Sequence, residues 1–343
     1  MRDDSISIAK AVAILLMVLA HTGFSQYGNY WINMFHMPLF FFFAGYCFKD
    51  KYLAMPKVFV KKRIAGLYKP FVKWSVIFLL LHNVFFYFNI YNGEYGFRGN
   101  VSRLYEWKDY VLGVVHIITR MSDNEQLLGG YWFLKSLFVG SLIGYVVIRT
   151  IKNKQLGGGI LLCVTIALAF FHKSMPYFGI GAKETFSAWF FFTGYCYKIS
   201  VSNIHIHKRR VIVPIGIVLV TFGVHFYQAT LLSFLWWQVL PYGITAVIAV
   251  LAVFHLCKRI AQEDNFVKRS LTFIGNNTLT ILTWHFLCFK IVSLVIIICY
   301  KLPVQRLAEF PVIGGYSEQG WFILYFLFGG SLPLLMTRSK LLK

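Results

Sequence analysis

A lysine and two histidines lie inside the apolar segments with which the chain begins. Lys10 and His21 enclose the run Ala-Val-Ala-Ile-Leu-Leu-Met-Val-Leu-Ala, and His36 precedes Met-Pro-Leu and four phenylalanines. Eleven residues make close to three helical turns, so Lys10 and His21 fall on one helix face, roughly 16 Å apart along the axis. Ionisable groups inside a bilayer are costly unless they are paired, and they therefore mark functional sites by default.

The imidazole rings of the two histidines are suited to acid–base chemistry at neutral pH. His21 lies near the outer end of the first apolar run, and His36 lies at a similar depth in the second. A buried imidazole stays neutral and can accept a proton as a general base. The alternative is a pair of packing histidines that bond to backbone or hydroxyl groups. Two histidines at matched depth above a lysine favour the catalytic interpretation.

Four cations lie at the inner ends of the apolar runs. Lys10 is about one turn into the membrane, and Lys61, Lys62 and Arg63 precede the third run. Dense positive charge suits phosphate groups, which indicates a binding site for an anionic donor that arrives from the cytosol. Neither feature strictly requires a ligand, however. Lys10 can extend its side chain to the headgroups, and the triplet can simply mark a cytoplasmic loop.

Four further residues are candidates for the acceptor side of a site or for its support. Trp132 and Lys135 stand at the outer end of one apolar run, Glu184 stands at the outer end of another, and His285 lies in the middle of a third. Lys135 lies too deep to be only a loop charge, and Glu184 is a possible partner for it or for a histidine. His285 needs a polar partner for the same reason.

The composition is that of a polytopic membrane protein. The 343 residues are 58% hydrophobic and only 14% charged, whereas soluble domains carry about a quarter charged residues. The net charge of +21 lies in short loops, which indicates positive-inside topology and contact with the lipid bilayer; nucleic acid is not an expected partner. No metal site is expected, because the cysteines lack ligand spacing and are predicted to be buried free thiols: Cys47, Cys163, Cys196, Cys257, Cys288 and Cys299.

We predict an all-α transmembrane bundle of about ten spans, forming a single integral-membrane domain over residues 1–343 with no separate soluble domain. The predicted spans are 6–24, 31–48, 67–90, 131–150, 157–172, 184–198, 210–228, 232–256, 278–300 and 320–337. Alternating basic loops place both termini in the cytoplasm. Two of these basic segments contain Lys208, Arg209 and Arg210, and Arg338, Lys340 and Lys343.

Two features of the connecting segments leave alternatives open. The segment Asn92–Gly130 is predicted to lie outside, where it either caps a substrate cleft or is a plain connector, and its apolar stretch Tyr110–Ile118 can lie along the membrane surface. A motif also occurs twice, as Phe41-Phe-Phe-Ala-Gly-Tyr-Cys-Phe-Lys49 and as Phe190-Phe-Phe-Thr-Gly-Tyr-Cys-Tyr-Lys198. Parallel repeats are typical of transporters, but such aromatic runs also commonly end a span at the cytoplasmic interface, and no further repeat surrounds either copy.

These residues together resemble the integral-membrane acyltransferase-3 family, which includes sugar and polysaccharide O-acetylases. The family has a basic residue and, eleven positions later, a His in its first span, as Lys10 and His21 stand here. The basic residue is usually Arg, and the inner loop usually repeats Arg where this chain has Ala65 and Gly66. Further family motifs are matched by Phe35 to Gly45, Lys62 to Pro70, Trp132 to Phe138, Ile274 to Leu279, and His285.

The resemblance implies an O-acyltransferase that moves a short acyl group, expected to be acetyl, from cytosolic acyl-CoA to a hydroxyl of a sugar or cell-surface polysaccharide outside. His21 would be the catalytic base or acyl acceptor, and His36 would orient it or bind the acceptor. Acyl-CoA would be a co-substrate with no permanently bound cofactor, and the location would be a bacterial cytoplasmic membrane.

The alternative function is a transporter or flippase of a polar glycan or lipid-linked sugar, coupled to protons through the same histidines. The sequence contains no Walker loop, no His-Glu-x-x-His and no Gly-x-Ser-x-Gly. These absences argue against ATP-driven transport, zinc proteolysis and serine hydrolysis.

Overall fold

The computed structural model describes residues 3–337, except residues 98, 123–124, 176–177 and 202–210. The described chain is all-α, as predicted. It divides into two compact units that alternate along the sequence, one with residues 1–13, 30–67 and 134–276 and one with residues 14–29, 68–133 and 277–343. The basic residues Lys208–Arg210 and those of the segment 338–343, on which the predicted topology partly relies, lie outside the described residues.

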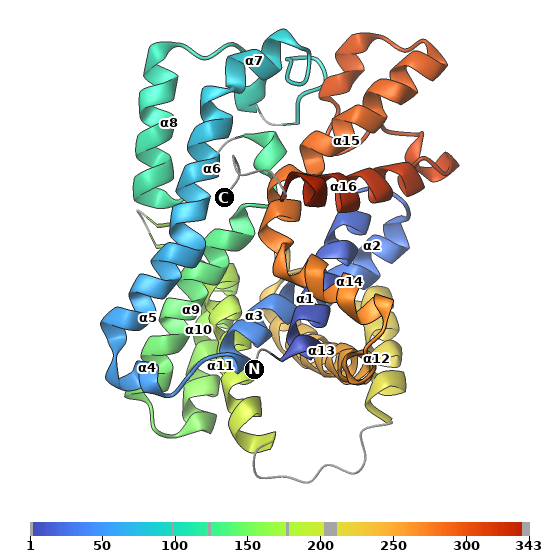
Figure 1. Cartoon of the computed structure of the whole chain (residues 1–343). Coiled ribbons are helices and arrows are strands. Elements are labelled where there is room, and N and C mark those ends of the chain that lie inside the picture. Colours follow the sequence, from blue (N-terminus) through green and yellow to red (C-terminus); the bar gives the residue numbers. More distant parts are fainter. Residues whose placement is uncertain (1–2, 98, 123–124, 176–177, 202–210, 338–343) are drawn as a thin grey trace. The chain divides into compact units, whose positions relative to one another are not determined.

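The first unit is a set of apolar helices in which α11 is central (Figure 1). This helix packs against both α3 and α10, and α12 packs against α13. Aromatic side chains from α4, α5, α9 and α11 and from the segment after α3 form one buried cluster, which includes Phe48, Phe59, Tyr145 and Phe191. The helices of this unit are α3 (His36–Tyr46), α4 (Lys51–Ala54), α5 (Pro56–Arg63), most of α9 (Trp132–Thr150), α10 (Lys154–Phe170), α11 (Ala182–Val201), α12 (Ile212–Phe226), α13 (Val239–Gln262) and α14 (Phe266–Asn276).

The second unit contains two pairs of packed helices. One pair is α15 (Thr278–Tyr300) with α16 (Phe322–Met336), and the other is α6 (Lys69–Leu80) with α8 (Trp107–Arg120). The short helix α7 (His82–Tyr87) follows α6 directly. Helices α1 (Asp4–Ala20) and α2 (Gln26–Asn33) contribute residues to both units.

Helix α8 runs antiparallel to α6. The Tyr68 hydroxyl, just before α6, donates to the Ile118 carbonyl near the end of α8 at 2.8 Å. At the other end of the pair, the Asn83 side chain makes two hydrogen bonds with the backbone of Tyr105, at 3.0 and 2.8 Å. The stretch Tyr110–Ile118 lies within α8, which packs against α6; its proposed place along the membrane surface stays a prediction.

Three helices in the described part of the chain are long and apolar enough to cross a membrane: Trp132–Thr150, Trp236–Gln262 and Thr278–Tyr300. The prediction of about ten such spans is therefore wrong. The predicted span 31–48 is interrupted between α2 and α3, and the predicted span 67–90 is interrupted at Leu81. Helices α10, α12 and α16 have only 15 to 17 residues, fewer than the ~20 that a bilayer of ~30 Å requires.

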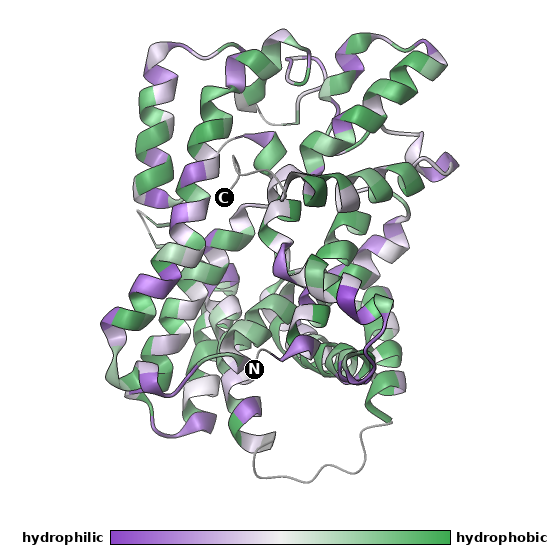
Figure 2. Ribbon diagram, in the orientation of Figure 1, coloured by the Kyte–Doolittle hydropathy of each residue, from purple (hydrophilic) through white to green (hydrophobic). Residues whose placement is uncertain are grey.

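The exposed surfaces of the helices are nevertheless those of a membrane protein. On α12, Val218, Phe222 and Phe226 are exposed over more than half of their surface. Figure 2 shows hydrophobic residues along most of α12, α15 and α16. Helices that are apolar on all sides are typical of membrane spans, whereas surface helices of soluble proteins have one polar face exposed to solvent. The chain is an integral membrane protein with apolar helical spans.

The six cysteines are free thiols, as predicted, but not all of them are buried. Cys257 and Cys288 are buried, whereas Cys47, Cys163 and Cys299 are exposed. These three lie at helix ends or on apolar helix faces that the protein itself does not cover. Within the described residues, no three His, Cys, Asp or Glu side chains lie together as metal ligands would.

The two copies of the repeated motif pack against each other. A Cβ atom on Gly45 of α3 would lie 1.7 Å from the carbonyl oxygen of Phe191, and a Cβ atom on Gly194 of α11 would lie 1.9 Å from that of Phe42. Phe42 and Phe191 occupy the same motif position, so the crossing is reciprocal. Glycine is required here because it lets the two backbones touch, as small residues do at interfaces between membrane helices.

We expect Gly45→Ala and Gly194→Ala each to lower the melting temperature in detergent, because an added methyl group forces α3 and α11 apart. Overpacking of this kind typically costs about 1–3 kcal/mol. Loss of monodisperse protein on heating, followed by size-exclusion chromatography, measures the effect. Gly159→Ala is the matched control, since no atom lies within 4 Å of its added Cβ. Equal melting temperatures for Gly45→Ala and the wild type would contradict the close crossing.

Candidate active site

His21 and His285 are in direct contact in the second unit. His21 follows the last residue of α1, and Gly23, at φ 69°, then turns the chain away in a conformation that glycine adopts readily. His285 is fully buried in α15. The Nδ1 atom of His21 lies 3.2 Å from Nε2 of His285, and the two rings stack with centroids 5.3 Å apart and planes inclined by 14°. His285 thus has the polar partner that its position in an apolar helix requires.

The hydrogen bonds of His285 define the protonation pattern of the pair. Its Nδ1 lies 3.0 Å from the carbonyl oxygens of both Ile281 and Leu282. Carbonyl oxygens only accept, so this nitrogen carries the hydrogen. In the neutral ring Nε2 then holds the lone pair and accepts the Nδ1 hydrogen of His21. The Nε2 of His21 consequently carries a lone pair, as a general base requires.

Aromatic rings line one side of the histidine pair. The ring centroid of Phe286 lies 4.8 Å from that of His21, and that of Phe310 lies 4.6 Å from that of Phe286. Gly129 packs against this layer, because its added Cβ would lie 3.0 Å from Phe310 and 3.5 Å from Phe286. Apolar surroundings of this kind lower the local dielectric and strengthen the hydrogen bond between the two rings.

His36 occupies the start of α3 in the first unit. It is buried, and its Nδ1 lies 2.9 Å from the carbonyl oxygen of Ile32, to which it donates. In the neutral ring its Nε2 therefore holds a lone pair, as in His21. The expected partnership of His36 with His21 stays a prediction. The ring that bonds to Nδ1 of His21 is that of His285.

The candidate donor-binding cations lie on helices of the first unit. Lys10 is half-buried in α1, and Lys61 and Lys62 are exposed near the end of α5, where Lys62 Nζ donates to the Tyr52 hydroxyl at 2.9 Å. Arg63 is half-buried, with its guanidinium carbon 5.0 Å from the ring centroid of Phe59. Burial lowers the pKa of Arg63 to about 10, so this side chain is still a cation at neutral pH.

Glu184 is buried at the start of α11 and is bonded through both carboxylate oxygens. Oε1 accepts from the Ser136 hydroxyl at 2.9 Å and lies 3.4 Å from Nζ of Lys183, and Oε2 accepts from the Gly181 N–H at 3.0 Å. Lys183 and not Lys135 is therefore the cation in ion-pair contact with it. A carboxylate held in this way orders the turn before α11.

Lys135 and Trp132 both lie in the first turn of α9. Lys135 is half-buried and interacts electrostatically with Glu184. Its Nζ lies 3.7 Å from the position that a Cβ atom on Gly179 would occupy. Trp132 is half-buried, with its ring edge-on to that of Phe133 at 6.5 Å. Their assignment to the acceptor side stays a prediction.

The family of the chain follows from its sequence over nearly the whole length. The profile of the acyltransferase domain matches residues 3–335. The chain belongs to the acyltransferase-3 family. No curated protein and no solved structure matches it. The resemblance seen in the motifs from Lys10 to His285 is thereby confirmed, and the protein is an acyltransferase-family enzyme of the membrane.

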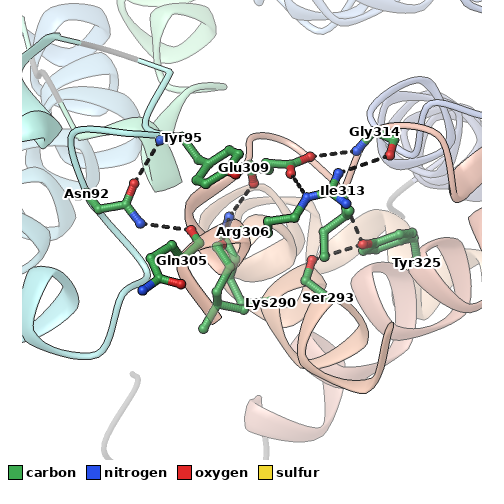
Figure 3. A network of polar contacts seen from close by, with 11 residues as sticks. Asn92, Tyr95, Lys290, Ser293, Gln305, Arg306, Glu309, Ile313, Gly314 and Tyr325 are labelled. Carbon is green, nitrogen blue, oxygen red and sulfur yellow. Dashed lines mark hydrogen bonds and ion pairs between the residues drawn. The ribbon is translucent and has the colours of Figure 1, made fainter. Parts of the chain in front are cut away.

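The acyltransferase contains a buried lysine that the sequence analysis missed. Lys290, in α15, is only 4% exposed, and its ammonium group donates to the carbonyl oxygens of Leu307 at 2.8 Å and Glu309 at 2.6 Å. Figure 3 shows this contact beside the ion pair of Arg306 with Glu309. Phe310 follows Glu309 directly, so Lys290 fixes the segment that supplies an aromatic ring next to Phe286. The sequence alone could have indicated Lys290, because it is an ionisable residue inside an apolar run.

A second buried pair ties α7 to the segment 92–130 of the acyltransferase. His82 and Glu125 are both buried, with Nδ1 of His82 3.1 Å from Oε1 of Glu125 and Nε2 of His82 3.0 Å from the carbonyl oxygen of Arg103. The Tyr105 ring stacks on the imidazole at a centroid distance of 3.4 Å. His82 is thus a structural histidine with both nitrogens bonded.

We expect Lys290→Met to accelerate backbone amide hydrogen exchange in residues 303–313, because two carbonyl groups lose their ammonium donor. Leaving a buried polar group without its partner costs about 1–3 kcal/mol. Hydrogen–deuterium exchange followed by mass spectrometry measures the change. Lys301→Met removes an exposed charge next to the same segment and serves as the control. Identical exchange in Lys290→Met and Lys301→Met would show that the ammonium group does not hold this segment.

Proposed function

We propose that this protein transfers a short acyl group, expected to be acetyl, from cytosolic acyl-CoA to a hydroxyl of a sugar or cell-surface polysaccharide on the outer side. Membership of the acyltransferase family supports the reaction class. Acyl-CoA is the proposed co-substrate, a carbohydrate is the proposed acceptor, and no permanently bound cofactor is needed. The proposed location is a bacterial cytoplasmic membrane with both termini inside.

The observation that carries this proposal is the hydrogen-bonded pair of His21 and His285. In one route, Nε2 of His21 takes the proton of the acceptor hydroxyl while the oxygen attacks the thioester carbonyl. The carbon–sulfur bond breaks, and the sulfur leaves as the CoA thiol with the proton returned by His21. In the other route, Nε2 attacks the thioester carbonyl, the carbon–sulfur bond breaks, and CoA leaves as the thiolate. The acceptor oxygen then attacks the acyl-imidazolium, the carbon–nitrogen bond breaks, and the hydroxyl proton passes to the thiolate, which leaves as the CoA thiol while His21 returns to its neutral form. His285 orients the ring of His21 in both routes.

Helix α1 supports a path from an inner donor to an outer acceptor. The helix is continuous from Asp4 to Ala20, and His21 follows it directly. Lys10 and His21 are therefore separated by about 16 Å along one helix axis. Lys10 is proposed to contact the phosphates of the donor, and His21 is proposed to act on its acyl group. Lys61, Lys62 and Arg63 are proposed to serve the same donor.

Two features supported the transporter alternative: the ten predicted spans, of which the described residues contain three, and the repeated motif of α3 and α11. In the structure the two copies make one close helix crossing through Gly45 and Gly194. This crossing gives both copies a packing role that needs no transport cycle. Consumption of acyl-CoA separates the two functions, because a transporter leaves the thioester intact.

We expect His21→Asn to lower the turnover of acyl-CoA by about 10²- to 10⁴-fold, since asparagine keeps a hydrogen bond but cannot accept a proton at neutral pH. His285→Ala should lower it by a smaller factor, because the base remains but loses its orientation. Release of CoA from acetyl-CoA by purified protein, in the presence of a panel of sugars and polysaccharides, measures turnover.

His225→Asn is the control for these variants, since it changes an exposed histidine at the end of α12. Well-folded His21→Asn with activity within a few-fold of the wild type would remove His21 from the mechanism. Wild-type protein that consumes no acyl-CoA with any acceptor would favour the transporter.

We expect an introduced cysteine at Lys108 to react with an impermeant maleimide in intact cells and one at Lys57 to react only after the cells are opened. Both positions are exposed, so reactivity depends on the side of the membrane. The positive-inside pattern puts Lys57 in the cytoplasm. Labelling at position 57 but not at 108 in intact cells would reverse the proposed orientation and, with it, the sides of donor and acceptor.

A further inference from the structure

Three cations of the first unit act electrostatically on the Cys47 thiol, which follows the last residue of α3. It is exposed, and electrostatic interactions link it to Lys10, Arg63 and Lys198. Asp3 is the one carboxylate that acts on the same group within the described residues. Three cations against one carboxylate leave an excess of positive charge around this thiol.

A direct contact places Lys198 at the end of α3, and Arg63 lies over a ring of α11, the helix that crosses α3 there. Nζ of Lys198, near the end of α11, donates to the carbonyl oxygen of Phe48 at 2.7 Å, and Phe48 is the residue after Cys47. The guanidinium of Arg63 lies 5.6 Å from the ring centroid of Phe191, whose backbone touches Gly45 two residues before Cys47. The close crossing of α3 and α11 thus carries Lys198 to the inner end of α3.

The repeated motif shows that this charge is not a general property of such a helix end. Cys196 is the counterpart of Cys47 in the second copy, and a single cation, Lys154, acts on it within the described residues. Lys49, the counterpart of Lys198, is exposed. Among the described residues, near-identical sequences therefore have different surroundings: three cations act on Cys47 and one acts on Cys196.

We propose that Lys198 completes, with Lys10 and Arg63, a phosphate-binding cluster beside Cys47 that holds the nucleotide phosphates of the acyl-CoA donor. The identity of the ligand rests on the proposed function, whereas the positive cluster does not. Like charges held close together repel one another, and a bound anion removes that cost through charge-assisted hydrogen bonds. Phosphates are multivalent oxyanions that can contact all three side chains.

The native Cys47 thiol serves as the reporter for this site. Purified protein is alkylated with N-ethylmaleimide over time, with or without desulfo-CoA, which carries the phosphates but has no thiol to consume the reagent. Peptide mass spectrometry then quantifies alkylation at Cys47 and at Cys196 in the same molecules. We expect desulfo-CoA to slow alkylation of Cys47 and to leave Cys196 unchanged. N-ethylpantothenamide, which has the same arm without nucleotide or phosphates, should protect neither.

Variants that remove or keep the charge of Lys198 test its role in phosphate binding. Lys198→Met should raise the desulfo-CoA concentration for half-protection of Cys47 by about tenfold or more, as expected for loss of one strong contact to a phosphate. Lys198→Arg keeps the charge and should restore protection, which also shows that a loss in Lys198→Met is not misfolding. Lys49→Met is the matched control from the other copy of the motif and should bind as the wild type does.

The outcomes separate this inference from the proposed function. Wild-type protein that transfers acyl groups while Cys47 stays unprotected by desulfo-CoA, or is protected equally in Lys198→Met, would overturn the cluster alone. Protection that depends on Lys198, in a protein that transfers no acyl group, would support the phosphate site and overturn the proposed reaction. Equal protection by N-ethylpantothenamide would also overturn the inference, because the contact would not involve phosphates.

Discussion

A polar or ionisable side chain inside an apolar helix bundle must find its hydrogen-bond partners within the protein, because lipid offers none. In this acyltransferase that constraint connects segments far apart in the sequence. His285 binds its own helix through Nδ1 and His21 through Nε2. Lys290 holds the segment after α15 through two carbonyl groups. The site is therefore positioned by the same bonds that make its buried polar groups tolerable.

Close contact between backbones is the second way in which this protein positions its helices. At the crossing of α3 and α11, Gly45 and Gly194 let two similar sequences meet in a reciprocal way. The backbones of the two copies cross symmetrically, but the charged side chains around them are not arranged symmetrically. Lys198 donates to the carbonyl oxygen of Phe48, and three cations act on Cys47. In the part of the chain that the structure describes, duplicated packing thus goes together with unequal charge at the two copies.

The sequence predicted the helical class and the family but not the lengths of the helices. Hydropathy shows that residues 31–48 and 67–90 are apolar, but it does not show that the helices break after Asn33 and at Leu81. The spacing of Lys10 and His21 was informative because one continuous helix carries both. The partner of His285 was not predictable, since a contact across 264 residues depends on how the helices pack. Lys290 could have been found, because the argument applied to Lys10 applies to it equally.

The choice of a histidine to orient His21 has a physical consequence for the proposed chemistry. A carboxylate in this place would stabilise an imidazolium, as it does in a catalytic triad, but it would also bury a full negative charge at a cost of several kcal/mol. His285 contacts His21 through Nε2 and its own helix through Nδ1, and as a neutral ring it would orient His21 without a buried charge. In the proposed reaction, an imidazolium formed on His21 would gain no counter-charge from a neutral His285. A proton taken from the acceptor must therefore move on quickly, and the sulfur of the departing CoA, formed next to the reacting carbonyl, is the group that can receive it. On this argument the histidine pair favours a concerted passage of the proton from hydroxyl to sulfur over a long-lived charged intermediate.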